Sequence, residues 1–137
     1  MFKVERVYTA CIVGDFPTIT AQQKGITKTG KVYTKPEVRA ARNWFAYRFP
    51  RPDYTLVESG TCYSVVIKFG YKTANKKLWG KYKSTRPDVD NQAKLILDVL
   101  KDIHVYSDDS AVVNLELSKK YAEFDYIDLD VYRIDED

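Results

Sequence analysis

The sequence predicts an α+β fold in which two helices pack on a four-stranded mixed sheet. Four segments alternate apolar and polar residues, as strands do, and two others have helical periodicity. They follow one another in the order β-α-β-α-β-β, which is typical of α+β domains. A chain of 137 residues, 45% hydrophobic and 14% aromatic, is about one domain long and can form a core. We therefore expect residues 1–137 to form a single domain.

The four expected strands are residues 2–13, 61–69, 112–121 and 126–134. The first is rich in β-branched and aromatic residues, and the second places alternate apolar side chains on one side. The last two also alternate, and the short turn between them predicts an antiparallel hairpin. The pattern leaves the strand order open.

Two segments are expected to be helices. The first contains Thr34 and Glu37 at the spacing of a capping box, and it ends before Pro50, which cannot continue a helix. The second begins at Asp90, which can cap it, and extends to about Ile103 with a broad apolar face.

Charge is divided unevenly along the chain. Residues 1–86 hold 17 Lys+Arg against 5 Asp+Glu, whereas residues 87–137 hold 5 against 14. This division indicates a polyanionic partner and a cation site, although charges that interleave on a folded surface would give the same totals. The expected loops, residues 14–35 and 70–86, are both basic. Their candidate DNA-binding residues are Lys28, Lys31, Lys35, Lys76, Lys77, Lys81, Lys83 and Arg86.

The scarcity of histidine and cysteine excludes several kinds of site. His104 is the only histidine, so a zinc site of the usual Cys/His type is not expected. A Ser-His-Asp triad would have to include His104. Cys11 and Cys62 are the only thiols, and we expect small buried residues rather than a disulfide. No apolar run reaches the roughly 20 residues that cross a bilayer, and the first residues lack the apolar stretch of a signal peptide. The expected location is the cytoplasm.

Two pairs of aspartates flank the second expected helix. Asp88 and Asp90 lie just before it and are separated by one residue, so in an extended segment both carboxylates project to one side. Asp108 and Asp109 are adjacent at the start of the following strand. A helix of about 13 residues spans roughly 20 Å, so the pairs meet only if the chain folds back. Together they would bind Mg²⁺, or Mn²⁺ in its place, through oxygen ligands.

Lys94 lies one helical turn after Asp90 and can reach the same edge. Its ammonium group could hold the scissile phosphate or stabilise developing charge. A structural alternative stays open here, because an aspartate at a helix N-terminus is often only a cap and the sequence SDDS can form a turn. Asp98 and Asp102 are expected at the surface or in support of the ligands rather than among them.

The combination of DVDNQAK, LDVL and SDDSAVV resembles the core pattern of the RusA family of Holliday junction resolvases, found in bacteria, prophages and phages. That pattern has D-x-D-N-x-x-K, a helix with D-x-L, and then D-D-S before an apolar strand. Residues 86–113 carry the specific part of the resemblance, and the N-terminal half is similar more loosely. Two positions depart from the pattern: Gln92 stands where an apolar residue is common, and Ala111 where many relatives have glutamine.

The resemblance implies a homodimeric, Mg²⁺-dependent endonuclease that resolves four-way DNA junctions by paired symmetric nicks, in recombination and repair. The metal ligands would be Asp88, Asp90 and Asp109, with Asp108 as a less certain member, and Lys94 would be the functional lysine. The implied partner is branched DNA, with no membrane and no small-molecule cofactor, in a bacterial or phage-infected cell.

Other interpretations of the same residues stay open. The RPD sequence suggests a PD-(D/E)-x-K nuclease, but no strand with D/E-x-K follows Asp88, since ELSK is one residue too long. A non-catalytic branched-DNA-binding module would use the same basic loops with the aspartates as helix caps, and a protein-interaction domain would carry scattered charge. Trp79 or Tyr82 could stack on an unpaired base, or pack against the sheet.

Overall fold

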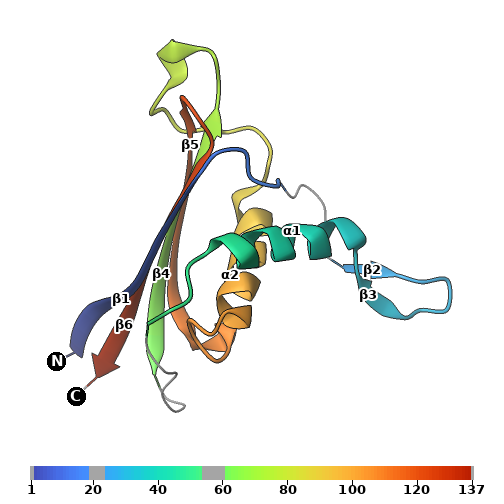
Figure 1. Cartoon of the computed structure of the whole chain (residues 1–137), viewed down its shortest axis with the longest axis vertical. Helices are drawn as coiled ribbons and strands as arrows, with labels where there is room; N and C mark the ends of the chain where they lie inside the picture. The colour runs from blue at the N-terminus through green and yellow to red at the C-terminus, as the bar shows by residue number, and fades with distance from the viewer. Residues whose placement is uncertain (1, 19–23, 54–60, 137) are drawn as a thin grey trace.

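The computed structural model describes residues 2–18, 24–53 and 61–136, and it confirms the α+β class. Four strands form a mixed sheet in the order β1-β6-β4-β5 (Figure 1). Their bounds are Phe2–Val13 for β1, Cys62–Lys72 for β4, Val112–Ala122 for β5 and Tyr126–Glu136 for β6. β6 pairs antiparallel with both β1 and β4, whereas β4 and β5 run parallel.

Two helices pack on this sheet, as predicted, and both lie on the same side of it (Figure 1). α1 spans Pro36–Arg48 and α2 spans Val89–Asp102. α2 connects β4 to β5, because parallel neighbours cannot be joined by a tight turn. The apolar sides of both helices and the inner face of the sheet form one core, in which Phe45, Phe69 and Leu100 are fully buried.

Neither predicted helix cap is made by a side chain. The N-cap of α1 is Lys35, so Thr34 and Glu37 do not form a capping box, and the N-cap of α2 is Asp88 rather than Asp90. Proline at the first position of α1 has no N–H to satisfy, which weakens the need for a capping side chain there.

The predicted hairpin between the last two strands is wrong. β5 and β6 both pair with β4, which lies between them, so the link at residues 123–125 passes over its end. The Asp125 carboxylate accepts the N–H of Lys72 at 2.7 Å at this end. Strands lie about 4.8 Å apart, and three extended residues span roughly 10 Å, which suffices to cross one strand. A short connection therefore does not distinguish a hairpin from a link over a neighbour.

A small hairpin inside the expected loop of residues 14–35 was missed. β2 (Lys24–Ile26) pairs antiparallel with β3 (Val32–Thr34), and Figure 1 shows the hairpin projecting beyond α1. Strands of three residues are too short for alternation to reveal them. The second basic loop, between β4 and α2, contains a 3₁₀ turn at Lys76–Leu78.

Both cysteines are free. Neither is fully buried as expected, since Cys62 is half-buried and Cys11 is exposed. Cys11 is exposed because it alternates along β1 with the buried Ala10 and Ile12, and so faces away from the core. Within the ranges that the structure describes, no helix is long and apolar enough to span a bilayer.

Gln92, one of the two departures from the pattern that the sequence resembles, is fully buried in α2. Its Nε2 donates to the carbonyl oxygen of Pro17 at 2.9 Å, which ties the segment after β1 to the start of α2. We expect Gln92→Leu to lower the free energy of unfolding by about 1–2 kcal/mol, because the Pro17 carbonyl then loses its donor. Urea denaturation followed by circular dichroism measures this change. An unchanged midpoint and slope would show that this bond does not stabilise the fold.

Candidate active site

The start of α2 presents two carboxylates to solvent. Asp88 is the N-cap residue, Asp90 lies in the first turn, and both are exposed. An N-cap aspartate commonly accepts an N–H of the first turn, but the Asp88 side chain makes no such bond. Its carboxylate is therefore available to a ligand, which argues against the interpretation of Asp88 as a helix cap only.

A lysine from β5 fixes the peptide that leads into these carboxylates. Lys119 Nζ donates to the carbonyl oxygens of Thr85 and Pro87, each at 2.7 Å. Hydrogen bonds from a charged donor are stronger than those between neutral groups. Lys119 thus positions Asp88 near the end of β5, and nothing in the local sequence around Lys119 indicates this role.

At the other end of α2 a buried tyrosine fixes the turn into β5. The Tyr106 hydroxyl donates at 2.7 Å to a carbonyl oxygen of the helix, and burial raises the pKa of this hydroxyl, so it remains a donor. His104 has φ of 68°, in the left-handed region, where the chain reverses after the helix. The turn brings Asp108 and Asp109 to the surface just before β5.

These two aspartates form an exposed acidic pair. Hydrogen bonding with the carboxyl group of Asp109, and then with Ser110, lowers the pKa of Asp108. The Nζ of Lys101, in the last turn of α2, lies 4.0 Å from Asp108 Oδ1 and also favours the ionised form. Asp108 is therefore charged at neutral pH and open to solvent.

Asp98 lies close enough to this pair for the charge of Asp109 to affect its pKa. Burial raises the pKa of Asp98, the positive charge of Arg42 opposes that rise, and the negative charges of Asp109 and Asp102 add to it. Arg42 of α1 is itself engaged, donating to Asp102 Oδ2 at 2.6 Å. The end of α2 thus carries a local excess of negative charge that a bound cation would relieve.

The two aspartate pairs lie at opposite ends of α2. Asp108 lies beside Lys101. Lys101 is 11 positions after Asp90 in the same helix, and this separation corresponds to roughly 16 Å along the helix axis. Among the described residues, no three His, Cys, Asp or Glu side chains form a group that could hold a metal ion. The expectation that both pairs meet within one chain is therefore wrong. Because β4 and β5 are parallel, α2 must run back along the sheet, which keeps its ends apart.

A stripe of charged side chains connects the two ends. Lys94 is exposed one turn after Asp90, and Asp98 and Lys101 follow at spacings of four and three residues. Residues at these spacings share a helix face. The same spacing is the signal in the sequence that could have associated Asp98 with the candidate ligands.

The candidate DNA-binding residues fall into two groups. Those of the first group, Lys28, Lys31 and Lys35, belong to the β2–β3 hairpin and its junction with α1. Those of the second group lie between residues 76 and 86, beside the ends of β4 and β5. Figure 1 shows the two segments on separate parts of the molecule. All eight side chains are at least partly exposed, so both groups can contact phosphates.

Comparison with protein families decides the identity of the chain. The family model described as "Endodeoxyribonuclease RusA" matches residues 15–131. The chain belongs to the RusA family. Membership confirms the resemblance seen in residues 86–113 and identifies an endodeoxyribonuclease, which argues against the PD-(D/E)-x-K, non-catalytic and protein-interaction alternatives.

Two curated proteins are similar to this RusA-family chain. A protein described as crossover junction endodeoxyribonuclease rusA, from Lactococcus phage r1t, is 30% identical over 117 residues, which cover 84% of this chain and 89% of the relative. A protein described as uncharacterized protein YqaN, from Bacillus subtilis strain 168, is 50% identical over 40 residues, which cover 29% of this chain and 28% of the relative. The similarity to the phage protein thus extends over nearly the whole of both chains.

Proposed function

We propose that this RusA-family nuclease is Mg²⁺-dependent and resolves four-way DNA junctions by paired, symmetric nicks. The observation that carries the proposal is the pair of exposed carboxylates at the start of α2, of which Asp88 is not used as a cap. The phage relative is described as a crossover junction endodeoxyribonuclease, which supports branched DNA as the substrate. The activity would take place in the cytoplasm of a bacterial or phage-infected cell.

The donor set suits a hard divalent cation. Carboxylates are the ligands that Mg²⁺ prefers, and Mn²⁺ accepts them too. Asp88 and Asp90 would supply one half of the site, and Asp109 with Asp108 the other half. Burial raises the pKa of Asp98, Arg42 opposes this rise, and the negative charge of Asp109 adds to it. When bound, the ion would offset negative charge on the phosphate that is cut.

One chain does not complete this set, because the halves lie at opposite ends of α2. A second copy, related by a twofold axis, can supply the missing half to each site. Such a dimer holds two equivalent sites, which is what paired nicks in opposed strands require. The separation of the aspartates therefore gives a physical reason for the homodimer that the family resemblance implies.

We place the contact between the copies at the free edge of β5. The chain's own residues 81–83 cover this edge only at its end, where they bond to the backbone of Lys119 and Tyr121. Before that point Val113 and Leu115 are 60% and 41% exposed, and no strand in the described ranges pairs with the edge. An unpaired edge with apolar side chains favours the addition of another strand.

Antiparallel pairing of two β5 strands about Leu115 places the start of each strand beside the end of the other. It sets Val112 of one copy opposite the partner's Ser118 and directs Asp109 toward the partner's Lys119. In each copy Lys119 holds the peptide that precedes Asp88. The same contact would therefore bring the two halves of the carboxylate set together on each side of the twofold axis.

Lys94→Ala is expected to lower the nicking rate about 100-fold and to change the junction Kd less than about threefold. The ammonium group one turn after Asp90 would stabilise charge on the phosphate as the bond breaks, whereas affinity is shared among many basic residues. Single-turnover nicking and fluorescence anisotropy measure the two quantities. Lys3→Ala, which removes an exposed lysine from β1, is the control. Equal losses of rate and affinity would contradict a catalytic role for Lys94.

The direct test of the proposed function is a nicking assay on a synthetic four-way junction. We expect paired nicks in Mg²⁺, none in EDTA, and much weaker cleavage of linear duplex with the same arm sequences. Equal cleavage of the duplex would refute the preference for branched DNA, and activity in EDTA would refute the metal requirement.

A further inference from the structure

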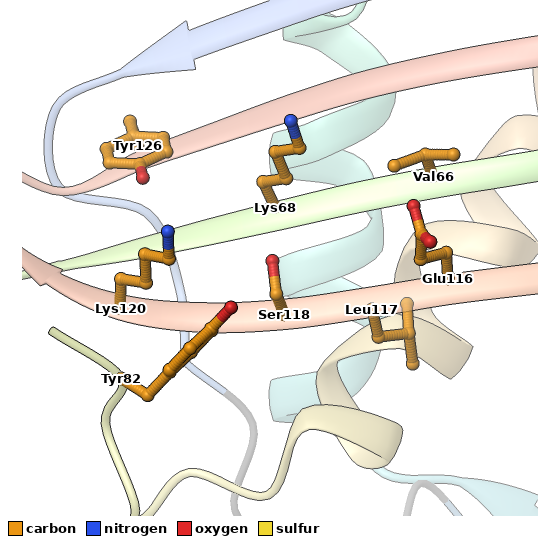
Figure 2. Close-up of a pocket in the computed structure, with 8 residues that line it drawn as sticks. All are labelled: Val66, Lys68, Tyr82, Glu116, Leu117, Ser118, Lys120 and Tyr126. Atoms are coloured by element: carbon orange, nitrogen blue, oxygen red, sulfur yellow. The ribbon is translucent and has the colours of Figure 1, made fainter. Parts of the chain in front are cut away.

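A pocket of about 440 Å³ lies on the face of the sheet that neither helix covers (Figure 2). Its volume is within the range of small-molecule sites, which is roughly 300–1,000 Å³. Figure 2 shows its walls rising from β4 and β5, with a tyrosine of β6 and one of the basic loop at one end. The lining residues are Val66, Lys68, Tyr82, Glu116, Leu117, Ser118, Lys120 and Tyr126.

Tyr82 of the basic loop combines a fixed backbone with an exposed ring. It forms an isolated bridge with Lys120, and its neighbours are bonded as well, Lys83 N to the Lys119 carbonyl at 3.1 Å and Tyr121 N to the Lys81 carbonyl at 2.9 Å. Nevertheless the Tyr82 side chain is 74% exposed. An aromatic residue whose backbone is already fixed loses little backbone freedom when its ring stacks on a ligand.

The structure separates the roles of the two aromatic residues in this loop. Trp79 donates its Nε1–H to the Thr73 carbonyl at 2.9 Å and is only partly exposed, so it stabilises the loop itself. Tyr82 instead faces Lys120, whose Nζ lies 5.0 Å from the ring centroid. A base that stacks on Tyr82 would therefore lie beside a positive charge.

Gly70 lets the second tyrosine of the pocket lie against the sheet. Tyr126 is its register partner across β6, and a Cβ on Gly70 would fall 1.9 Å from Tyr126 Cε2. Only glycine leaves room for the ring at this position. Tyr126 is half-buried there and forms a second aromatic wall at the same end of the pocket as Tyr82 (Figure 2).

Charge is graded along the pocket. Lys68 lies beside Ser118 in the parallel register, and Lys120 is two positions further along β5. Glu116 lies at the other end beside Val66, four positions and roughly 13 Å before Lys120. Asp128 of β6 is exposed opposite Lys68 in the antiparallel register and offsets part of the positive charge of Lys68. An anionic group is therefore favoured on the Lys120 side of Lys68, and a hydrogen-bond donor near Glu116.

We propose that this pocket binds one unpaired nucleotide of branched DNA, with its base against Tyr82 and its phosphate between Lys68 and Lys120. The proposal rests on the proposed function for its substrate class and adds a second contact surface to it. Lys119 and Lys120 are adjacent in β5 and point to opposite faces, one toward the peptide before Asp88 and the other into the pocket.

The test measures the affinity of the Asp90→Asn protein for a fluorescent oligothymidylate and for a duplex, in EDTA. Tyr82→Ala is expected to weaken single-strand binding about tenfold and duplex binding less than about twofold, because stacking on an aromatic residue contributes roughly 1–3 kcal/mol per base. Tyr82→Phe should bind as Tyr82 does. Tyr47→Ala removes another aromatic, 89% exposed on α1, and is the control that should leave both affinities unchanged. Equal single-strand affinities for Tyr82→Ala and its parent would overturn the proposal.

A second measurement places the nucleotide directly. An oligonucleotide with 5-iodouracil at one position is irradiated on the protein, and mass spectrometry identifies the linked residue. Crosslinks to Tyr82 or Tyr126 are expected, and crosslinks confined to other aromatic residues would overturn the proposal. Junction nicking by the wild-type protein is scored separately, so a failure of the proposed function does not alter these binding results, nor do they decide it.

Discussion

Asp90→Asn is expected to abolish Mg²⁺-dependent nicking of four-way junctions while junction binding is kept or strengthened. We expect a loss of at least about 1,000-fold, or about 4 kcal/mol of activation free energy, because the site loses a charged ligand. Asp90 is exposed in the first turn of α2, so an amide of the same shape should leave the core unchanged. Removing a negative charge near the DNA backbone also lessens repulsion.

Nicking is followed by gel electrophoresis in Mg²⁺, binding by anisotropy in EDTA, and folding by thermal denaturation. Asp88→Asn should behave in the same way, since its carboxylate is also uncapped and exposed. Asp53→Asn replaces an exposed aspartate outside α2 and should nick at the wild-type rate. Near-normal nicking by Asp90→Asn would remove the basis for the metal site. Loss of folding together with activity would give Asp90 a structural role instead.

The strands and helices were predictable because their signals are local. Alternation marks β1, β4, β5 and β6 whatever their neighbours, and the apolar spacing of both helices follows from burial of one side. The strand order was not predictable in the same way, because it depends on which strand the core covers completely. Ile127, Leu129 and Val131 of β6 are all buried, whereas Leu115 of β5 is 41% exposed. That contrast identifies β6 as a central strand and β5 as an edge, but only with the sheet in view.

For the candidate site, too, the local features were predictable and the spatial arrangement was not. Motif spacing singled out Asp88, Asp90, Lys94 and Asp109, and the structure places all of them at the surface of α2 or just after it. Spacing along the chain says nothing about whether groups at two ends of a helix meet. That question depends on the direction of β5 relative to β4, and parallel pairing keeps them apart. The exposed Tyr82 shows the same limit, since exposure depends on neighbours that lie far away in sequence.

Mixing Asp90→Asn chains with Asp109→Asn chains is expected to restore nicking that neither variant has alone. If each site combines the start of α2 from one copy with Asp109 of the partner subunit, a mixed dimer contains one site with both substitutions and one intact site. Random exchange gives mixed dimers in about half of the population, so about a quarter of the sites are intact. If the ligands came from a single chain, every site would carry one substitution and activity would stay absent.

The products provide a second, independent prediction of the same experiment. A mixed dimer with one intact site should nick one strand of the junction, so singly nicked junctions should accumulate without resolved duplexes. Asp88→Asn mixed with Asp90→Asn is the matched control, because both changes affect the same half and leave no site intact. Exchange of chains is verified with differently tagged copies. If exchange is complete and the Asp90→Asn and Asp109→Asn mixture still fails to nick, the two halves do not come together across the β5 edge, and the carboxylate set must be completed in another way.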